Sequence, residues 1–166
     1  WSTFLNPLFG PCTRFPEYEL RTLDNGLQVV FVGHHEQPAV NVRLLVRAGA
    51  SSDPPGQPGV AALTGQLLDQ GTASQSAQEI AQAIDNVGGL AVGAGSDLSF
   101  INVLAMKDSF ALALEMLSEI ARRPAFAPVE LERQRQQVLS GLQVSYADPA
   151  YVAGAVSYTH LRAHET

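Results

Sequence analysis

The feature that most limits how this chain can fold is a tight turn between two strand-like segments near its start. Apolar and polar residues alternate over residues 17–22, and residues 27–32 follow the triplet Asp24-Asn25-Gly26. An Asn-Gly pair supplies the positive φ angles of a short hairpin turn, so the two segments are expected to pair antiparallel. Residues 40–46 alternate in the same way, with one break at Leu45, and are expected to form a third strand.

The remainder of the chain alternates between helical and strand patterns. Ser76 and Glu79 have the spacing of a capping box, which predicts a helix start. Asp108 is expected to cap a later helix with Leu114, Leu117 and Ile120 facing inward. The patterns predict two helices, a second pair of strands and two more helices, covering about residues 60–67, 76–87, 90–95, 98–106, 108–120 and 128–142. The order ββ-β-αα-ββ-αα predicts an α+β fold with an antiparallel or mixed sheet.

Composition excludes several classes of function. The net charge is −6, the only lysine is Lys107 and nine arginines are scattered, so no basic stripe can follow a nucleic-acid backbone. No apolar run approaches the roughly 18 residues of a membrane span. Cys12 is the only cysteine, so no internal disulfide can form. His34 and His35 are adjacent and would point to opposite faces of a strand, which favours a solvated loop over a metal site.

The two ends of the chain differ from its middle. The sequence starts with Trp1, and three of residues 1–16 are proline, which indicates a lead or linker. The apolar pattern ends at Val156, and we expect residues 157–166 to be a non-native tail. His160 and His164 in that tail are four residues apart, but the neighbouring glutamate follows the second histidine, so we do not expect a metal site. A single incomplete domain over residues 17–156, in a fragment of a longer chain, is the expected organisation.

Several short motifs in this domain resemble one family. They are Leu23-Asp24-Asn25-Gly26-Leu27, Arg47-Ala48-Gly49-Ala50, the stretch from Gly59-Val60-Ala61-Ala62 to Gly71-Thr72, Pro124-Ala125-Phe126 and Glu132-Arg133-Gln134-Arg135. Together they are similar to the N-terminal-type domain of the pitrilysin, insulinase and mitochondrial processing peptidase family, the inverzincin metallopeptidases. The similarity extends over about residues 17–156. It implies a metalloprotease-type domain in which helices pack on one face of the sheet.

Active members of that family place H-x-x-E-H on the helix after the Gly-Val-Ala entry, and a later glutamate completes the zinc site. In this sequence the first histidine position is Ala62, the glutamate position is Gly65 and the second histidine position is Gln66. The distal glutamate falls on Gly141 or a close neighbour. The resemblance therefore implies that this domain has no catalytic residue, no metal ligand and no cofactor. Close helix packing is a second explanation for Gly65, since glycine costs roughly 1 kcal/mol relative to alanine inside a helix.

The function implied by the resemblance is that of a non-catalytic homologue of a zinc endopeptidase. Such a domain would form a peptide-holding chamber with an active domain of the family, on the same chain or a separate subunit, and zinc would belong to that active partner. The family's peptide-contacting Asn-Ala-x-Thr stretch falls on Val92-Gly93-Ala94-Gly95, so only backbone pairing with an extended peptide is expected to remain. Two alternatives are open: a longer active enzyme whose motif lies outside this sequence, and a purely structural complex subunit. Fragment status and the resemblance favour an exported or periplasmic bacterial protein.

Overall fold

The computed structural model describes residues 16–163, except for the side chains of Val87 and residues 158–163. The chain divides into two compact units, one ending at Pro38 and the other beginning at Ala39. Each unit is described by itself below.

The described part of the first unit is a β-hairpin. Strands β1 (Tyr18–Thr22) and β2 (Gln28–Val32) pair antiparallel, with Tyr18 opposite Val32. The turn is closed by the N–H of Gly26, which donates to the carbonyl of Leu23 at 2.8 Å, and Gly26 has a φ of 84°. The tight turn predicted from the Asn-Gly pair is confirmed, because only this residue type adopts positive φ without strain.

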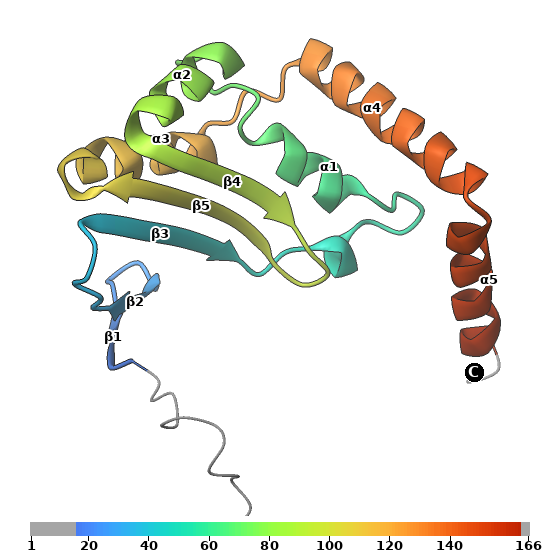
Figure 1. The fold of residues 1–166 in the computed structure, drawn as a ribbon, viewed down its shortest axis with the longest axis horizontal. Coiled ribbons are helices and arrows are strands. Elements are labelled where there is room, and N and C mark those ends of the chain that lie inside the picture. Colours follow the sequence, from blue (N-terminus) through green and yellow to red (C-terminus); the bar gives the residue numbers. More distant parts are fainter. Residues whose placement is uncertain (1–15, 164–166) are drawn as a thin grey trace, which may run out of the picture. The chain divides into compact units, whose positions relative to one another are not determined.

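The second unit is built on a three-stranded antiparallel sheet (Figure 1). Its strands are β3 (Ala39–Val46), β4 (Gly88–Ala94) and β5 (Ser99–Met106), in the spatial order β3-β5-β4. Strand β5 is therefore central, and β3 and β4 each pair on one side only within the described part of the chain. The α+β fold with antiparallel strands is confirmed.

Three helices cover one face of this sheet: α1 (Val60–Leu67), α2 (Ala77–Val87) and α3 (Phe110–Arg122) (Figure 1). Alternate residues of β5 point into the layer between sheet and helices, where they meet apolar residues of α2 and α3. This core consists of Ile80, Ile101, Val103, Ala105, Ala113, Met116, Leu117 and Ile120, all buried. Every second residue of the strand, and residues three or four apart on the helices, therefore contribute their side chains to one hydrophobic layer.

The structure tests two predicted helix starts and the predicted inward face of α3. The capping box is confirmed, because the N–H of Ser76 donates to the Glu79 carboxylate at 2.8 Å and the N–H of Glu79 donates to the Ser76 hydroxyl at 3.3 Å. The expected cap at Asp108 is wrong. A short 3₁₀ turn, Lys107–Ser109, precedes α3, and no side chain caps that helix. Of the three residues of α3 expected to face inward, Leu117 and Ile120 are buried as predicted. Leu114 is not, because it is 45% exposed at the border of the buried stripe.

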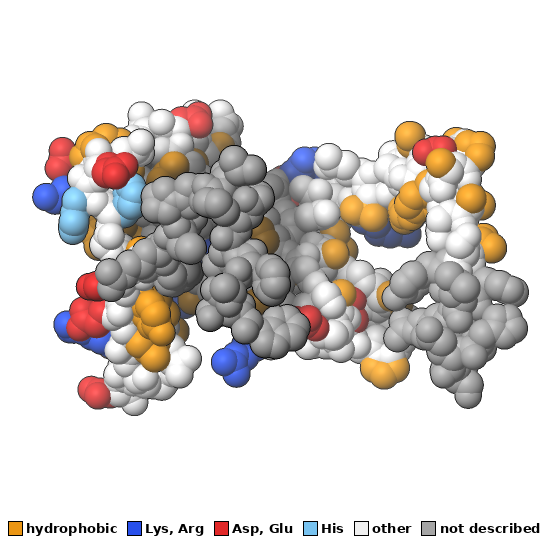
Figure 2. All heavy atoms as spheres, turned by 60° about the horizontal axis from the view of Figure 1, so that its bottom comes forward, with side chains coloured by type: hydrophobic (Ala, Val, Ile, Leu, Met, Phe, Trp, Pro, Cys, Tyr) orange, Lys and Arg blue, Asp and Glu red, His pale blue; other side chains and the backbone are white. Residues whose placement is uncertain are grey.

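The last two helices, α4 (Pro128–Ala147) and α5 (Pro149–Ala163), contribute no described residue to this buried core. No residue of α4 is buried, and apolar side chains remain exposed along both helices, including Val144, Tyr146 and Val156 (Figure 2). Helix α5 was not among the expected elements. It runs through the position where the non-native tail is expected to start, so the expected tail boundary stays a prediction. His164 lies outside the described residues. None of the described helices has the length and apolar character that crossing a membrane requires.

Candidate functional site

Helix α1 contains three of the four positions at which the resemblance puts the motif, and a side chain from the preceding loop holds the start of this helix. Gly59 at the N-cap has a φ of 98° and no side chain to cap the helix. The carboxylate of Asp53 supplies the acceptors instead: the N–H groups of Gly59 and Ala61 each donate to it at 2.7 Å. Charge-assisted bonds to the first free N–H groups of a helix stabilise its N-terminus. The start of α1 is therefore set by a residue six positions upstream.

Ala62, Gly65 and Gln66 differ in how far the structure buries them. Ala62 and Gln66 are exposed, whereas Gly65 is buried against β4. A β-carbon on Gly65 would lie 2.9 Å from the backbone nitrogen of Ala94 and 2.9 Å from the carbonyl carbon of Gly93. Such contacts are closer than packed carbon atoms tolerate. Close packing, the second explanation for this glycine, is supported by these distances.

The fourth motif position, Gly141, lies on α4, a helix that contacts α1. Nothing lies within 4 Å of where a β-carbon on Gly141 would be. A hydrogen bond from the guanidinium of Arg133 to the side-chain oxygen of Gln70 also joins α4 to the segment that follows α1. The tertiary structure therefore brings together the two helices on which the motif positions were predicted.

A cleft of about 450 Å³ lies where α1, β4 and α4 meet. Four glutamines line it, two from α1 and the residues after it and two from α4: Gln66, Gln70, Gln134 and Gln137. Asp69 adds one carboxylate, and Val92 and Val138 provide apolar wall. Of these residues, the sequence analysis predicted a site position only for Gln66 and, within the peptide-contacting stretch, for Val92; it named Gln134 only as part of a family-like motif. The sequence did contain a signal for the two glutamines of α4. Gln134 and Gln137 are three residues apart and therefore share one face of that helix.

The glutamine side chains of this cleft differ in whether they form hydrogen bonds within the protein. The amide nitrogen of Gln70 donates to Asp69 at 2.7 Å, and its oxygen accepts from Arg133. The side-chain amides of Gln66, Gln134 and Gln137 make no hydrogen bond within the part of the chain that the structure describes. A free primary amide offers two donors and one acceptor oxygen. The cleft is thus polar, with hydrogen-bonding groups available to a ligand.

The residues at the motif positions do not fit zinc. Alanine and glycine have no donor atom, and a glutamine amide is a poor ligand beside the imidazoles, thiolates and carboxylates that zinc prefers. Among the side chains that the structure describes, no group of three or more from histidine, cysteine, aspartate or glutamate is placed to hold a metal ion. His34 lies instead in an exposed loop of the first unit, 3.9 Å from the carboxylate of Glu36. No metal-dependent step can be assigned to these residues.

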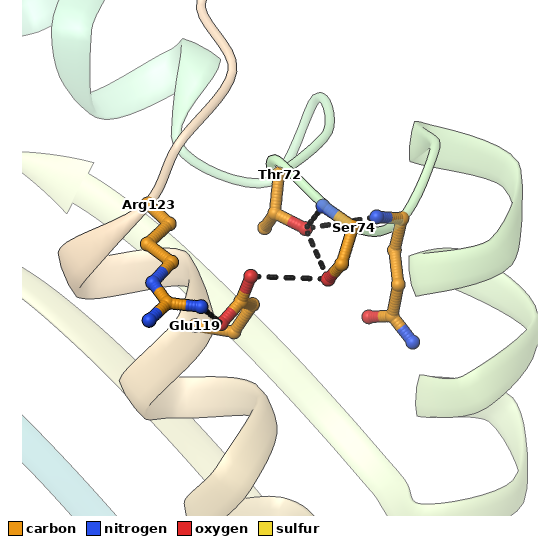
Figure 3. Close-up of polar contacts among 5 residues, drawn as sticks. Thr72, Ser74, Glu119 and Arg123 are labelled. Carbon is orange, nitrogen blue, oxygen red and sulfur yellow. Dashed lines mark hydrogen bonds and ion pairs between the residues drawn. The ribbon is translucent and has the colours of Figure 1, made fainter.

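A second polar cluster holds the loop that leaves α1 (Figure 3). The hydroxyl of Thr72, a buried residue, accepts from the N–H of Gln75 at 3.1 Å, and the Ser74 hydroxyl donates to Glu119 of α3 at 3.0 Å. Arg123 lies 3.9 Å from the same carboxylate. Because these groups are used within the cluster, its role is to anchor the α1–α2 loop to α3.

Comparisons with known proteins agree with this architecture. The family model described as Insulinase (Peptidase family M16) matches residues 28–165. An uncharacterized zinc protease of Rickettsia bellii is 23% identical over 133 residues, which are 80% of this chain and 32% of that protein. The alpha subunit of the mitochondrial-processing peptidase of Solanum tuberosum is 26% identical over 135 residues, 81% of this chain and 27% of that protein. The chain thus spans about a third or less of the length of these curated relatives.

Solved structures show the same likeness. A peptidase M16 inactive domain from Pseudomonas fluorescens superposes with a TM-score of 0.77 at 29% identity, over 82% of this chain and 34% of that one. A protease from Helicobacter pylori superposes with a TM-score of 0.69 at 23% identity, over 76% of this chain and 31% of that one. The second of these shows the fold alone.

Proposed function

Because the chain belongs to the insulinase family, peptidase family M16, we propose that it is a non-catalytic partner of a zinc endopeptidase domain. In this proposal an active domain of the family supplies zinc and the general base. The present domain supplies part of the wall of a chamber that holds an extended peptide. The active domain belongs either to the same polypeptide or to a separate subunit.

The observation that carries the proposal is a retained fold without the groups that peptide hydrolysis needs. The helix and sheet layer around α1 is intact, yet Ala62, Gly65 and Gln66 occupy the positions of the zinc-binding motif. Metal-assisted hydrolysis needs a bound ion to activate water and a base to accept its proton, and general acid–base catalysis alone typically contributes about 10²–10⁴-fold. A domain that lacks these groups can still position a peptide for another domain.

The packing of α1 on β4 adds support. The resemblance puts the motif glutamate at Gly65, where the backbone of Gly93 and Ala94 occupies the space that a side chain would need. A glutamate there would require α1 to move away from the strand. The likeness to a domain named inactive, from Pseudomonas fluorescens, supports the same interpretation.

Peptide holding is supported by the edge of the sheet. In the described residues β4 pairs only with β5, so the N–H and C=O groups along its other edge are without strand partners. An extended peptide can add to such an edge through backbone hydrogen bonds, which require no particular side chain.

The test is to measure peptidase activity of the chain alone and together with a domain of the family that has an intact H-x-x-E-H motif. The partner is taken from the same reading frame or from an adjacent gene. We expect no cleavage of a fluorogenic peptide by the chain alone. Cleavage that a chelator abolishes is expected from the assembled pair, and replacement of the partner's motif glutamate should remove it.

Two outcomes would contradict the proposal. Chelator-sensitive cleavage by the purified chain alone would show that it is itself an active enzyme. Stable assembly with the intact-motif domain that never yields activity, while that domain is active with another partner, would identify a purely structural subunit.

A further inference from the structure

We propose that the cleft lined by Gln66, Gln134 and Gln137 binds the main chain of an extended peptide, and that Asp69 makes it prefer a peptide with a lysine or arginine. This inference deepens the proposed function and rests on it, since it names the part of the domain that contacts the peptide and the kind of peptide selected. It assigns the glutamine at the second histidine position a binding role in place of metal ligation.

The first argument is the chemistry of the lining. Each peptide unit has one N–H donor and one C=O acceptor, and a primary amide offers the complementary acceptor and donor. Gln66 on α1 faces the cleft from one side, and Gln134 and Gln137 on α4 from the other. Their amides have no partner among the described residues, so a bound peptide would not have to break an internal hydrogen bond to use them.

The second argument is the charge of the cleft. Among the described residues, Asp69 is the only ionisable one that lines the cleft, and no described lysine, arginine or histidine lines it. The neighbouring Arg133 is already engaged with Glu130 at 2.7 Å and with Gln70. One carboxylate oxygen of Asp69 accepts from Gln70, while the other makes no hydrogen bond within the described residues. A half-buried carboxylate with a free oxygen attracts a cationic side chain and repels an anionic one.

The third argument is position and size. Val92 of β4 lines the cleft, so the cleft opens beside the strand whose outer edge is free. Its volume of about 450 Å³ falls within the roughly 300–1,000 Å³ of clefts that hold small ligands. A short length of extended peptide next to β4 would therefore come within reach of amides from both helices.

The experiment measures binding of fluorescein-labelled ten-residue peptides to the full chain by fluorescence anisotropy, at low salt. Three peptides share a glycine-serine background and differ at one central residue, which is lysine, norleucine or glutamate. We expect the lysine peptide to bind most tightly and the glutamate peptide least. Gln134→Leu and Gln137→Leu each remove amide hydrogen bonds at nearly constant size, and should weaken binding of all three peptides about 3- to 10-fold.

Two further variants make the test specific. Asp69→Asn should remove the preference for the lysine peptide over the norleucine peptide. Gln143→Leu lies on the same helix but outside the cleft, and should leave all three affinities unchanged. Circular dichroism of each variant confirms that the helices are retained.

The inference is overturned if Gln134→Leu and Gln137→Leu both bind like the unmodified chain, if binding requires an added divalent cation, or if the unmodified chain binds no peptide, alone or assembled with an active domain. These outcomes differ from failure of the proposed function. Assembly and activity with an active domain, without an effect of the cleft variants, would refute the cleft alone. Variant-sensitive binding without any assembly would refute the partner role and leave the cleft as a peptide site.

Discussion

Gly65 of α1 lies directly against Gly93 of β4, so that a β-carbon on Gly65 would be 2.9 Å from the carbonyl carbon of Gly93. The helix therefore rests on the strand with no side chain between them at this point. This close contact explains why glycine, and no larger residue, fits at position 65 inside the helix. It also limits which substitutions are tolerated at that position.

Gly65→Ala is expected to destabilise the protein. Alanine would recover roughly 1 kcal/mol of helix propensity, but overpacking against backbone costs typically about 1–3 kcal/mol. Gly141→Ala is the matched control, because it is also inside a helix and nothing lies within 4 Å of its β-carbon position; it should stabilise by about 0.5–1 kcal/mol. Urea denaturation of both variants measures the difference. Equal stabilisation by the two alanines would contradict the close contact.

Rebuilding the zinc motif should not rebuild a zinc site. The triple variant Ala62→His, Gly65→Glu, Gln66→His introduces a glutamate side chain where β4 leaves no space. We expect it to unfold at a lower temperature than the double variant Ala62→His, Gln66→His, whose two changes are at exposed positions. Thermal unfolding with and without zinc, together with metal analysis, compares the two. A triple variant that bound one zinc ion and kept its melting temperature would show that α1 accommodates the glutamate without cost.

Asp53→Ala should weaken the start of α1. It removes a carboxylate that accepts from the N–H groups of Gly59 and Ala61, both at 2.7 Å. Loss of a helix-capping side chain costs about 0.5–2 kcal/mol. Asp97→Ala, at an exposed turn between β4 and β5, is the control and should change stability by less than about 0.5 kcal/mol. Hydrogen exchange of the α1 amides, with urea denaturation, locates the effect. Unaltered protection of α1 in the Asp53 variant would argue against this cap.

The capping box predicts a pH dependence of stability. Hydrogen bonds from the backbone N–H and the hydroxyl of Ser76 hold the pKa of Glu79 below its ordinary value of 4.5. Because the pKa is lower in the folded state, the carboxylate's contribution is present above pH 4.5 and is lost as the pH falls through the folded pKa. Glu79→Gln should therefore reduce the loss of stability on acidification below that value.

Urea midpoints of this variant and the unmodified protein, measured between pH 6 and about pH 3, test the sign. Glu115→Gln, on an exposed position of α3, serves as the control and should follow the unmodified protein more closely. A Glu79→Gln variant whose acid dependence matched the unmodified protein would show that the capping carboxylate does not contribute.

Local signals in the sequence predicted local structure well. The Asn25-Gly26 turn and the Ser76–Glu79 capping box formed as expected, since each depends on residues within a few positions of one another. The expected cap at Asp108 was wrong because the chain continues from β5 into a 3₁₀ turn. Asp108 lies within this turn and Ser109 takes the N-cap position of α3. The prediction that Leu114 faces inward was wrong because contacts with β5 determine which face of α3 is buried. Helical spacing alone does not show where the buried face ends.

By itself, the sequence determined the order of the strands and of helices α1 to α4, and the resemblance that places alanine, glycine and glutamine at the motif positions of a peptidase. Those properties depend on backbone preferences and hydrogen bonds between near neighbours. Only the tertiary structure decided that Gly65 abuts Gly93 and that Gln66 shares a cleft with Gln137. The distances between such pairs depend on how closely separate helices and strands pack, which is determined by side-chain volumes summed over the whole layer and by no single stretch of chain.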